Sequence, residues 1–357
     1  MHNFKNILIT GGAGFVGSNL GFFLKRDFPK TSITALDNLK RRGSELNLLR
    51  LQEVGIDFIH GDIRNREDLI SVGSFDLILE CSAEPSVLAG YDSSPNYMLN
   101  TNLIGTINCL EAARLQNSSM IFLSTSRVYP IEAINKLEIR EEKTRFELED
   151  NQPFPGAGSK GLSEKFPLEG ARSLYGTTKL CSELLLQEYT AMYGIKGVVN
   201  RCAVLTGPWQ MGKIDQGVVV HWAARHIFGG DLAYFGYGGT GKQVRDILHI
   251  EDLYDLIKIQ MDNINDHAGN VYNVGGGRET SLSLFELTRL CEKISGNVLS
   301  IGSISETRQG DIPIYISDCS KLYNATGWKP KHNSEEIVSE IIKWIRDNQE
   351  SLHPILS

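Results

Sequence analysis

The first half of the chain alternates short apolar runs with longer segments of helical periodicity. Runs such as Ile7-Leu8-Ile9-Thr10 show no polar alternation, which is typical of buried strands. The pattern predicts strands over 7–10, 32–36, 57–60, 76–79, 120–124 and 197–200, and helices over 16–26, 45–54, 98–115 and 174–193. Strands without an exposed face, separated by helices, indicate a parallel sheet covered on both sides. We therefore predict an α/β fold built on a doubly wound parallel sheet.

The alternation weakens after Arg201. Helices near 216–228 and 283–295, with a glycine-rich turn over 236–241, predict a smaller mixed α/β unit, and 271–274 is expected to return as a strand to the first sheet. We expect a cofactor domain over 1–200 and a mainly substrate-binding, interleaved domain over 201–357. The charged insertion 131–172, rich in proline and glycine, reads either as a functional loop or lid or as a mobile surface insertion.

Composition narrows the class of protein. With 357 residues, of which 41% are hydrophobic, the chain can bury two cores, and a net charge of −7 disfavours non-specific binding to nucleic acid. The N-terminus lacks the shape of a signal peptide, and no apolar stretch approaches the ~18 residues of a membrane helix. Six scattered cysteines form no C-x-x-C pair and no Cys/His cluster with metal-ligand spacing. We expect a cytoplasmic protein with reduced cysteines, no metal site and no membrane partner.

Glycines follow the first predicted strand at the spacing of a dinucleotide site. The run 12–17 fits G-x-G-x-x-G, and Gly11, Gly14 and Gly17 also fit the tighter G-x-x-G-x-x-G spacing. Glycine is needed because backbone N–H groups must approach a pyrophosphate with no Cβ in the way. The N-terminus of the following helix directs its positive end at that anion. Strand, turn and helix together predict a Rossmann dinucleotide site.

Two carboxylates bear on the cofactor. Asp37 closes the second predicted strand, twenty positions after Gly17. It can accept hydrogen bonds from a ribose diol and would repel a 2′-phosphate, which favours NAD over NADP, although Arg41 and Arg42 would weaken that preference. Asp62 follows the third strand and is expected either beside the adenine amino group or as a helix N-cap.

A phenol and an ammonium group share one face of a predicted helix. Tyr175 and Lys179 are four residues apart, and a nearby cation favours the phenolate form of a tyrosine, which can then act as a general base. The fifth strand ends in Ser124-Thr125-Ser126, at the sheet edge where ligands bind in such folds. One of these hydroxyls is expected to hydrogen-bond the sugar oxygen that Tyr175 deprotonates, the alternative being that they cap the end of the strand.

With these motifs the chain resembles, over nearly its whole length, the extended short-chain dehydrogenase/reductase family of nucleotide-sugar epimerases and dehydratases. The segments that carry the resemblance are 10–17, 37–38, 61–63, 102–106, 124–126, 175–179 and 244–249. The resemblance implies that Thr125, Tyr175 and Lys179 are catalytic and that Lys179 also holds the nicotinamide ribose. It implies NAD as cofactor, bound by Gly11, Gly14, Phe15, Val16, Gly17, Asp37, Asn38, Asp62, Ile63, Ala83, Asn102, Tyr175 and Lys179.

The same resemblance bears on partners. It implies that a nucleoside diphosphate sugar binds to the second unit and that the chain forms a homodimer through the helices 98–115 and 174–193. It also implies a place in polysaccharide biosynthesis. Binding of the diphosphate needs cations, for which Arg245 and Arg308 are the candidates, although each could instead be a salt-bridge partner, Arg308 with Asp311 for instance. The residues expected at the substrate are Glu84, Arg127, Gln216, Arg245, Arg308 and Asp311.

One dipeptide separates the branches of this family. The 4,6-dehydratases carry Asp-Glu after the catalytic Thr, whereas this chain has Ser126-Arg127, which cannot protonate a leaving hydroxyl well. Epimerisation, with no net loss of water, is therefore expected. Stretches similar to the CDP-paratose 2-epimerase branch are 37–43, 127–129, 142–146, 161–164, 215–217 and 241–246.

Two segments depart from that branch. Cys81-Ser82-Ala83-Glu84 replaces a His-Leu-Ala-Gly/Ala-Gln type of segment, and Tyr129-Pro130 replaces Tyr-Gly. Glu84 stands where a neutral Gln would face the sugar or the cofactor. Two alternatives stay open: a UDP-hexose 4-epimerase with the same machinery, and a catalytically silent NAD-binding sensor or scaffold.

Overall fold

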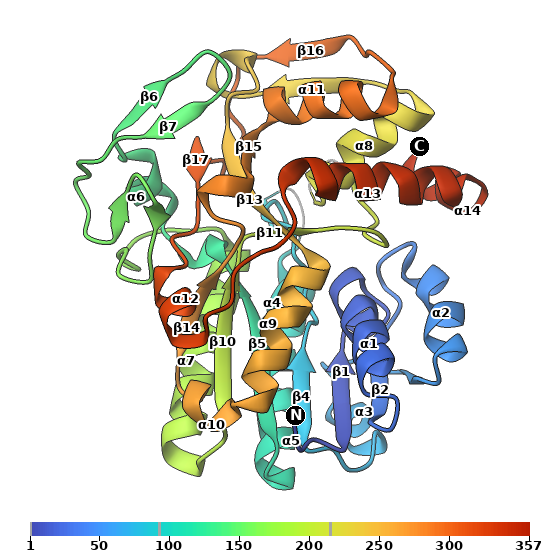
Figure 1. Cartoon of the computed structure of the whole chain (residues 1–357). Helices are drawn as coiled ribbons and strands as arrows, with labels where there is room; N and C mark the ends of the chain where they lie inside the picture. The colour runs from blue at the N-terminus through green and yellow to red at the C-terminus, as the bar shows by residue number, and fades with distance from the viewer. Residues whose placement is uncertain (1, 92–93, 214–215) are drawn as a thin grey trace. The chain divides into compact units, whose positions relative to one another are not determined.

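The computed structural model describes residues 2–91, 94–213 and 216–357, and its contacts divide the chain into two compact units (Figure 1). Unit 1 comprises Met1–Val128, Leu174–Arg201 and Leu253–Tyr272, and unit 2 comprises Tyr129–Ser173, Cys202–Asp252 and Asn273–Ser357. The division expected at residue 200 differs in two places. The insertion belongs to unit 2, and Leu253–Tyr272 belongs to unit 1 because side chains such as Tyr254 pack against the end of helix α1.

A seven-stranded sheet forms the centre of unit 1, in the strand order β14-β10-β5-β4-β1-β2-β3 (Figure 1). The pairs β1–β2, β1–β4, β2–β3 and β4–β5 are all parallel. The strands are β1 (Asn6–Thr10), β2 (Ser32–Asp37), β3 (Asp57–His60), β4 (Leu77–Glu80), β5 (Ser119–Thr125), β10 (Gly197–Cys202) and β14 (Val271–Val274). The predicted doubly wound parallel sheet is confirmed.

Two groups of helices accompany this sheet. Its α-helices are α1 (Phe15–Asp27), α2 (Asn47–Glu53), α3 (Arg66–Ser71), α4 (Asn96–Leu99), α5 (Gly105–Gln116), α7 (Leu174–Tyr193), α9 (Ile250–Asp262) and α10 (Ile264–His267). Successive strand side chains point to opposite faces, so Leu8 joins a buried cluster with α3, α5 and α7, while Ile9 meets Gly21 of α1. The helix predicted over 98–115 is interrupted, because Asn100–Ile104 forms a π-helical turn between α4 and α5.

Unit 2 contains smaller sheets. One joins β11 (Val204–Thr206), β13 (Val244–His249), β15 (Ser281–Ser283) and β17 (Ile314–Tyr315), and another pairs β12 (Leu232–Phe235) with β16 (Ile301–Ile304). Its longer helices are α8 (Val218–Phe228), α11 (Leu284–Ser295), α12 (Ser320–Thr326), α13 (Ser334–Asp347) and α14 (Gln349–Leu356). Helices α8, α11 and α13 pack against one another. Within the described residues, no helix has the length and apolar character needed to cross a membrane.

The insertion has secondary structure of its own. It forms helix α6 (Ile131–Asn135), the hairpin of β6 (Ile139–Glu141) and β7 (Phe146–Leu148), and the short pair β8 (Ala157–Gly158) and β9 (Gly161–Leu162). Arg145 anchors it, because the guanidinium group forms ion pairs with Glu147 at 2.9 Å and Glu286 at 3.3 Å and donates to Ser281 Oγ at 2.6 Å. The insertion is therefore attached to β15 and α11 of its own unit.

Candidate active site

The glycine turn connects β1 to α1 and has the shape of an anion cradle. Gly11 has a φ of +64°, and a Cβ there would lie 3.0 Å from the carbonyl carbon and oxygen of Cys81. A Cβ on Gly17 would lie 2.4 Å from the carbonyl oxygen of Gly11, so neither position admits a side chain. No side chain caps α1, whose N-cap is Gly14. The first turn, with Phe15 and Val16, therefore offers unshielded backbone N–H groups to a pyrophosphate.

Asp37 lies at the end of β2, beside this turn. Its carboxylate accepts hydrogen bonds from the backbone N–H of Ala13 at 3.1 Å and of Leu39 at 2.8 Å. Burial raises the pKa of Asp37, and these hydrogen bonds oppose that rise. The carboxylate is thus held in place by backbone groups on both sides, as a ribose-binding group requires.

Asp62 and Ile63 follow β3, and both were expected at the cofactor. Burial alone would raise the pKa of Asp62, but hydrogen bonds from Arg64 and Asn38 outweigh it and lower that pKa to about 2. Asp62 does not cap α3, whose N-cap is Asn65. The side chain of Ile63 is buried against Gly105 of α5, and its carbonyl oxygen accepts a hydrogen bond from Asn108 at 2.9 Å.

Asn102 is fully buried and its side chain fastens a loop. Its Oδ1 accepts the backbone N–H of Glu84 at 2.8 Å, and its Nδ2 donates to the carbonyl oxygen of Glu84 at 3.1 Å. These two bonds fix the loop 81–84, which contains Ala83 and faces Gly11. The carboxylate of Glu84 turns back to accept the N–H of Ser86 at 3.3 Å. Asn102 thus fixes the loop that faces the glycine turn.

The three expected catalytic residues all lie in unit 1. Helix α7 packs against β5 and carries Tyr175 and Lys179 one turn apart, with relative exposures of 9% and 2%. Thr125 ends β5, and its hydroxyl accepts the backbone N–H of Arg127 at 3.2 Å. The Ser124 hydroxyl instead donates to Glu183, which pairs with Arg201 at 2.7 Å. The Ser124 hydroxyl is thus committed to a buried network and differs in this from that of Thr125.

Glu80 is a residue that the sequence analysis missed. It is the last residue of β4 and fully buried, and its Oε2 lies 3.7 Å from Nζ of Lys179. The same ammonium group lies 4.0 Å from the centre of the Phe122 ring. The available signal was a carboxylate that closes an otherwise apolar central strand, since such a group needs a buried partner.

The expected substrate residues of unit 2 are partly engaged with one another. Arg245 on β13 donates to Asp311 Oδ1 at 2.9 Å and to the carbonyl oxygen of Ile312 at 2.8 Å. Asp311 therefore pairs with Arg245 and not, as the sequence suggested, with Arg308. The guanidinium of Arg308 instead lies 3.6 Å from the ring centre of Phe235. The backbone of Gln216 exchanges two hydrogen bonds with the backbone of Lys213. Asp215, which belongs to the stretch 215–217 of the sequence analysis, lies outside the described residues.

Comparison with known proteins identifies the family. The model of the NAD dependent epimerase/dehydratase family matches residues 7–275. The chain belongs to this family. A CDP-paratose 2-epimerase of Salmonella typhi is 32% identical, over 95% of this chain and 98% of that protein. The epimerase/dehydratase resemblance seen in the sequence is therefore confirmed.

Solved structures of the family have the same fold. A dTDP-glucose 4,6-dehydratase of Bacillus anthracis in complex with NAD is 25% identical, with a TM-score of 0.77 over 98% of this chain and 99% of that one. A UDP-glucose 4-epimerase of Thermotoga maritima with UDP-glucose is 26% identical, with a TM-score of 0.76 over 96% and 99%. The expected enzyme class and NAD as the cofactor are confirmed, and the glycine cradle fits that cofactor.

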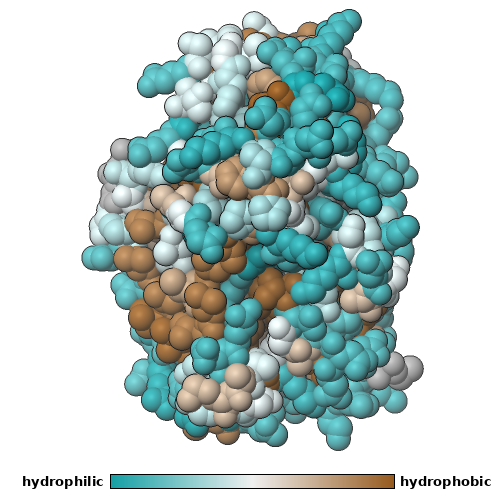
Figure 2. Space-filling view, turned by 90° about the vertical axis from the view of Figure 1, so that its left-hand side faces the viewer, coloured by the Kyte–Doolittle hydropathy of each residue, from teal (hydrophilic) through white to brown (hydrophobic). Residues whose placement is uncertain are grey.

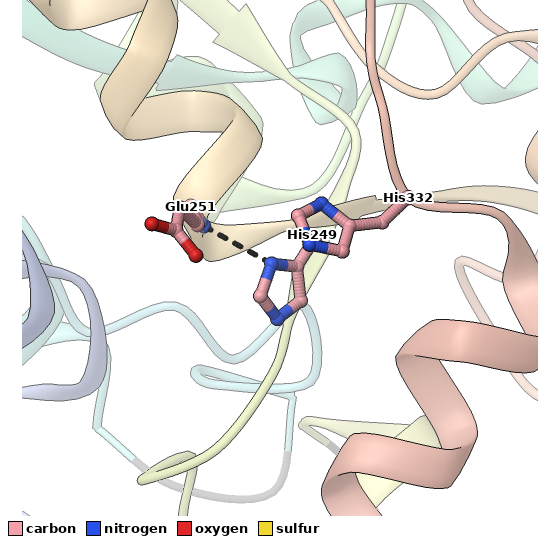
Figure 3. A group of neighbouring side chains, drawn as sticks. All are labelled: His249, Glu251 and His332. Atoms are coloured by element: carbon pink, nitrogen blue, oxygen red, sulfur yellow. Dashed lines mark hydrogen bonds between the residues drawn. The ribbon is translucent and has the colours of Figure 1, made fainter.

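Outside the expected active site, unit 2 contains a polar cluster of His249, Glu251 and His332 (Figure 3). Its ligand atoms lie within 4.8 Å of one another, close enough for a metal ion, and the imidazole rings are 4.2 Å apart. Each ring has an internal partner. His249 Nδ1 accepts the backbone N–H of Glu251 at 3.3 Å, and His332 Nδ1 lies 3.0 Å from Asp252. His249 Nε2 also lies 3.2 Å from Glu340, so both rings of the cluster already have partners within the protein.

Proposed function

We propose that the chain is an NAD-dependent nucleotide-sugar epimerase that inverts C2 of a CDP-sugar, as CDP-paratose 2-epimerase does. The observation that carries the proposal is the pair of Tyr175 and Lys179 on α7, beside a strand that ends in Thr125. The Ser126-Arg127 dipeptide after Thr125 supports epimerisation over dehydration, since neither side chain protonates a leaving hydroxyl well. The similarity to the Salmonella typhi protein supports the choice of substrate.

Each catalytic side chain has a defined part in this reaction. Tyr175 takes the proton from the C2 hydroxyl and later returns one, with the buried Lys179 one turn away favouring the phenolate. Thr125 hydrogen-bonds the sugar oxygen and holds it for this transfer. Bound NAD supplies the hydride acceptor and the hydride donor for the two half-reactions. Between them, the 2-keto sugar turns so that its other face is reduced.

The site for NAD is assigned to groups of unit 1. The backbone of Gly11–Gly17 would hold the pyrophosphate, and Asp37 the adenosine ribose. Asn38 would contribute here as well, because its amide donates to Asp62 Oδ2 at 2.9 Å and so links the two strand ends. Lys179 would hold the nicotinamide ribose.

The diphosphate of the substrate is assigned to Arg245 and Arg308 of unit 2. A bidentate guanidinium group suits a phosphate, and Asp311 holds that of Arg245 in one orientation. Arg308 remains stacked on Phe235, where an aromatic ring supports its planar group. We assign Gln216, Glu84 and Arg127 to the sugar or base.

The test is a panel of CDP-, UDP-, GDP- and dTDP-sugars followed by NMR. We expect inversion at C2 of a CDP-sugar, and Tyr175→Phe should lower kcat by about 100-fold or more. The matched control is Tyr193→Phe, an exposed tyrosine on the same helix, which should leave kcat unchanged. Turnover by Tyr175→Phe at the wild-type rate would remove the assignment of Tyr175, and no turnover by the wild type on any sugar of the panel would favour a silent NAD-binding sensor or scaffold.

A UDP-hexose 4-epimerase is the second candidate. The likeness to the Thermotoga maritima structure supports it, because the same side chains would act with C4 facing the nicotinamide. Conversion of UDP-glucose to UDP-galactose, with CDP-sugars untouched, would select this alternative.

We also propose a homodimer formed by α7 and the helical segment Asn96–Gln116. Both carry exposed apolar side chains, and Figure 2 shows hydrophobic residues gathered over the face that includes α7. These side chains are Ile104, Leu115, Leu174, Leu184, Met192 and Tyr193. Leu184→Glu should convert the dimer to a monomer in sedimentation analysis, whereas Leu49→Glu, at a more exposed leucine on α2, should not. A wild-type chain that sediments as a monomer would contradict the proposal.

A further inference from the structure

We propose that Glu80 is a positioning residue for Lys179, and that its carboxylate fixes the ammonium group and offsets its charge. It thereby sets the pH range in which Tyr175 can accept a proton. This inference rests on the proposed catalytic role of Tyr175 and Lys179. It adds a member to the site that the motif on α7 does not contain.

The placement of Glu80 is the first support. β4 is the middle strand of the sheet, and its last residue lies in register between Thr10 of β1 and Phe122 of β5. Glu80 therefore lies on the strand between β1, which leads into the glycine turn, and β5, which carries the Phe122 ring beside Lys179. A single side chain at this position reaches both parts of the site.

The contacts of the carboxylate are the second support. Its Oε1 accepts the backbone N–H of Ser82 at 3.1 Å and a long hydrogen bond from Thr10 Oγ1 at 3.5 Å. Its Oε2 accepts no hydrogen bond from the described residues and has Nζ of Lys179 at 3.7 Å. One oxygen is thus tied to the loop that faces Gly11, and the other is left for the ammonium group.

Burial makes this pair consequential. Glu80 is 0% exposed and Lys179 2% exposed, so neither charge is screened by water. A buried charge without a partner is costly, and each group here offsets the other. Burial raises the pKa of Glu80, and the charge of the neighbouring Lys179 offsets part of that rise.

Few other titratable groups face the pair. Cys109 of α5 lies close enough to interact with both charges, and burial raises its pKa well above the usual range, so its thiol stays neutral. Tyr175 lies one turn before Lys179 on α7. The ammonium group of Lys179 and the carboxylate of Glu80 are therefore two charges of unit 1 that bear on the tyrosine.

The sign of the effect follows from these charges. The ammonium group favours the phenolate of Tyr175, and the carboxylate behind it reduces that effect. Glu80→Gln keeps the size of the side chain and an oxygen that can accept from Ser82, but it removes the negative charge. The phenol should then titrate at lower pH, and the acid limb of the activity profile should move in the same direction.

The experiment is an ultraviolet titration of the NAD-loaded protein. The difference between the wild type and Tyr175→Phe isolates one phenol among twelve tyrosines. The same difference is measured in the Glu80→Gln background, where we expect the midpoint to fall by about one pH unit. The measurement needs no sugar substrate, so a failure of the proposed epimerase activity is seen separately in the substrate panel.

Two further variants complete the test. Glu183→Gln removes a different buried carboxylate, which lies on the helix α7 that carries Tyr175 and pairs with Arg201. This variant should leave the midpoint of the Tyr175 titration unchanged. Glu80→Asp keeps the charge but withdraws it by one methylene and should give a smaller fall than Glu80→Gln. A wild-type midpoint in Glu80→Gln overturns the proposal, as does an equal shift in Glu183→Gln. If Glu80→Gln does not fold, a wild-type midpoint in Glu80→Asp overturns it.

Discussion

The side chain of Asn102 hydrogen-bonds both the backbone N–H and the carbonyl oxygen of Glu84, at 2.8 and 3.1 Å. The amide sits in the π-helical turn Asn100–Ile104, and its Nδ2 also lies 3.3 Å from Thr178 Oγ1 on α7. One buried side chain thus ties together the loop that faces the glycine turn and the helix that carries Tyr175. π-Turns are frequent at functional sites, and here the turn aims an amide at a loop.

We predict that Asn102→Ala loosens the loop 81–84 and weakens NAD binding. The substitution removes both hydrogen bonds from the part-buried backbone of Glu84, which should lower the free energy of unfolding by about 1–2 kcal/mol. It should also lower NAD affinity by about tenfold, measured by calorimetric titration. The control is Asn200→Ala, which removes another buried amide, one that bonds Gln260 twice at 2.8 Å. This control should lose stability and retain NAD affinity, and equal affinities in both variants would refute the assignment.

Asp37→Ser should relax the preference for NAD over NADP. The carboxylate is oriented by the N–H groups of Ala13 and Leu39, so its loss removes both a ribose acceptor and the repulsion of a 2′-phosphate. We expect NAD affinity to fall about tenfold and NADP affinity to rise. Asp57→Ser, at the start of the neighbouring strand β3, should change neither affinity. An unchanged NAD-to-NADP ratio in Asp37→Ser would show that another group selects the cofactor.

Arg145→Ala should detach the insertion from β15 and α11. Arg145 is largely buried and forms ion pairs with two carboxylates, so its removal takes a cation from Glu286 and leaves Glu147 with Arg278 at 2.7 Å. We expect a loss of about 2–3 kcal/mol in unfolding free energy and faster limited proteolysis within 136–165. Arg140→Ala, at an exposed arginine of the same insertion, should leave the stability unchanged. Equal proteolysis of the two variants would contradict this role of Arg145.

The pair of His332 and Asp252 should make stability depend on pH. The hydrogen bond to Asp252 raises the pKa of His332; burial would raise the pKa of Asp252, but bonds from His332 and its neighbours outweigh it and lower that pKa. The contribution of His332 is therefore complete below its ordinary pKa of 6.5 and is lost as the pH rises through its higher folded value.

His332→Asn offers a test, because its amide can donate a neutral hydrogen bond to Asp252. The wild type should be more stable by about 1 kcal/mol at pH 6, and this advantage should disappear in alkaline solution. Denaturant unfolding at a series of pH values measures the difference. An advantage that grows with pH would reverse the assigned sign.

Local patterns predicted the sheet and the cofactor turn, since unbroken apolar strands such as Ile7–Ile9 and the glycines after them are short-range signals. The α13 helix also had such a signal, in apolar positions from Ile337 to Ile345 and a capping box of Asn333 and Glu336, although the sequence analysis did not use it. The limits of that helix were therefore within reach of sequence reasoning.

Pairings between distant residues were beyond those patterns. Arg308 and Asp311 are three residues apart and suggested a local salt bridge, but Asp311 pairs with Arg245, 66 positions away, because β13 brings the guanidinium to it. The link between Glu80 and Lys179 is likewise made by the order of strands and helices and not by spacing. The π-turn at Asn100–Ile104 carries no sequence signature, so the orientation of Asn102 could not be foreseen.

The division of the chain into interleaved segments has a consequence for its synthesis. Unit 1 includes Leu253–Tyr272, and the edge strand β14 of its sheet spans Val271–Val274. A ribosome must therefore have translated more than 270 residues before the first sheet can close, even though its glycine turn was made at the outset. Between the synthesis of β10 and that of β14 the nascent chain exposes β10 as an unpaired edge, which is the period in which chaperones would have most to protect.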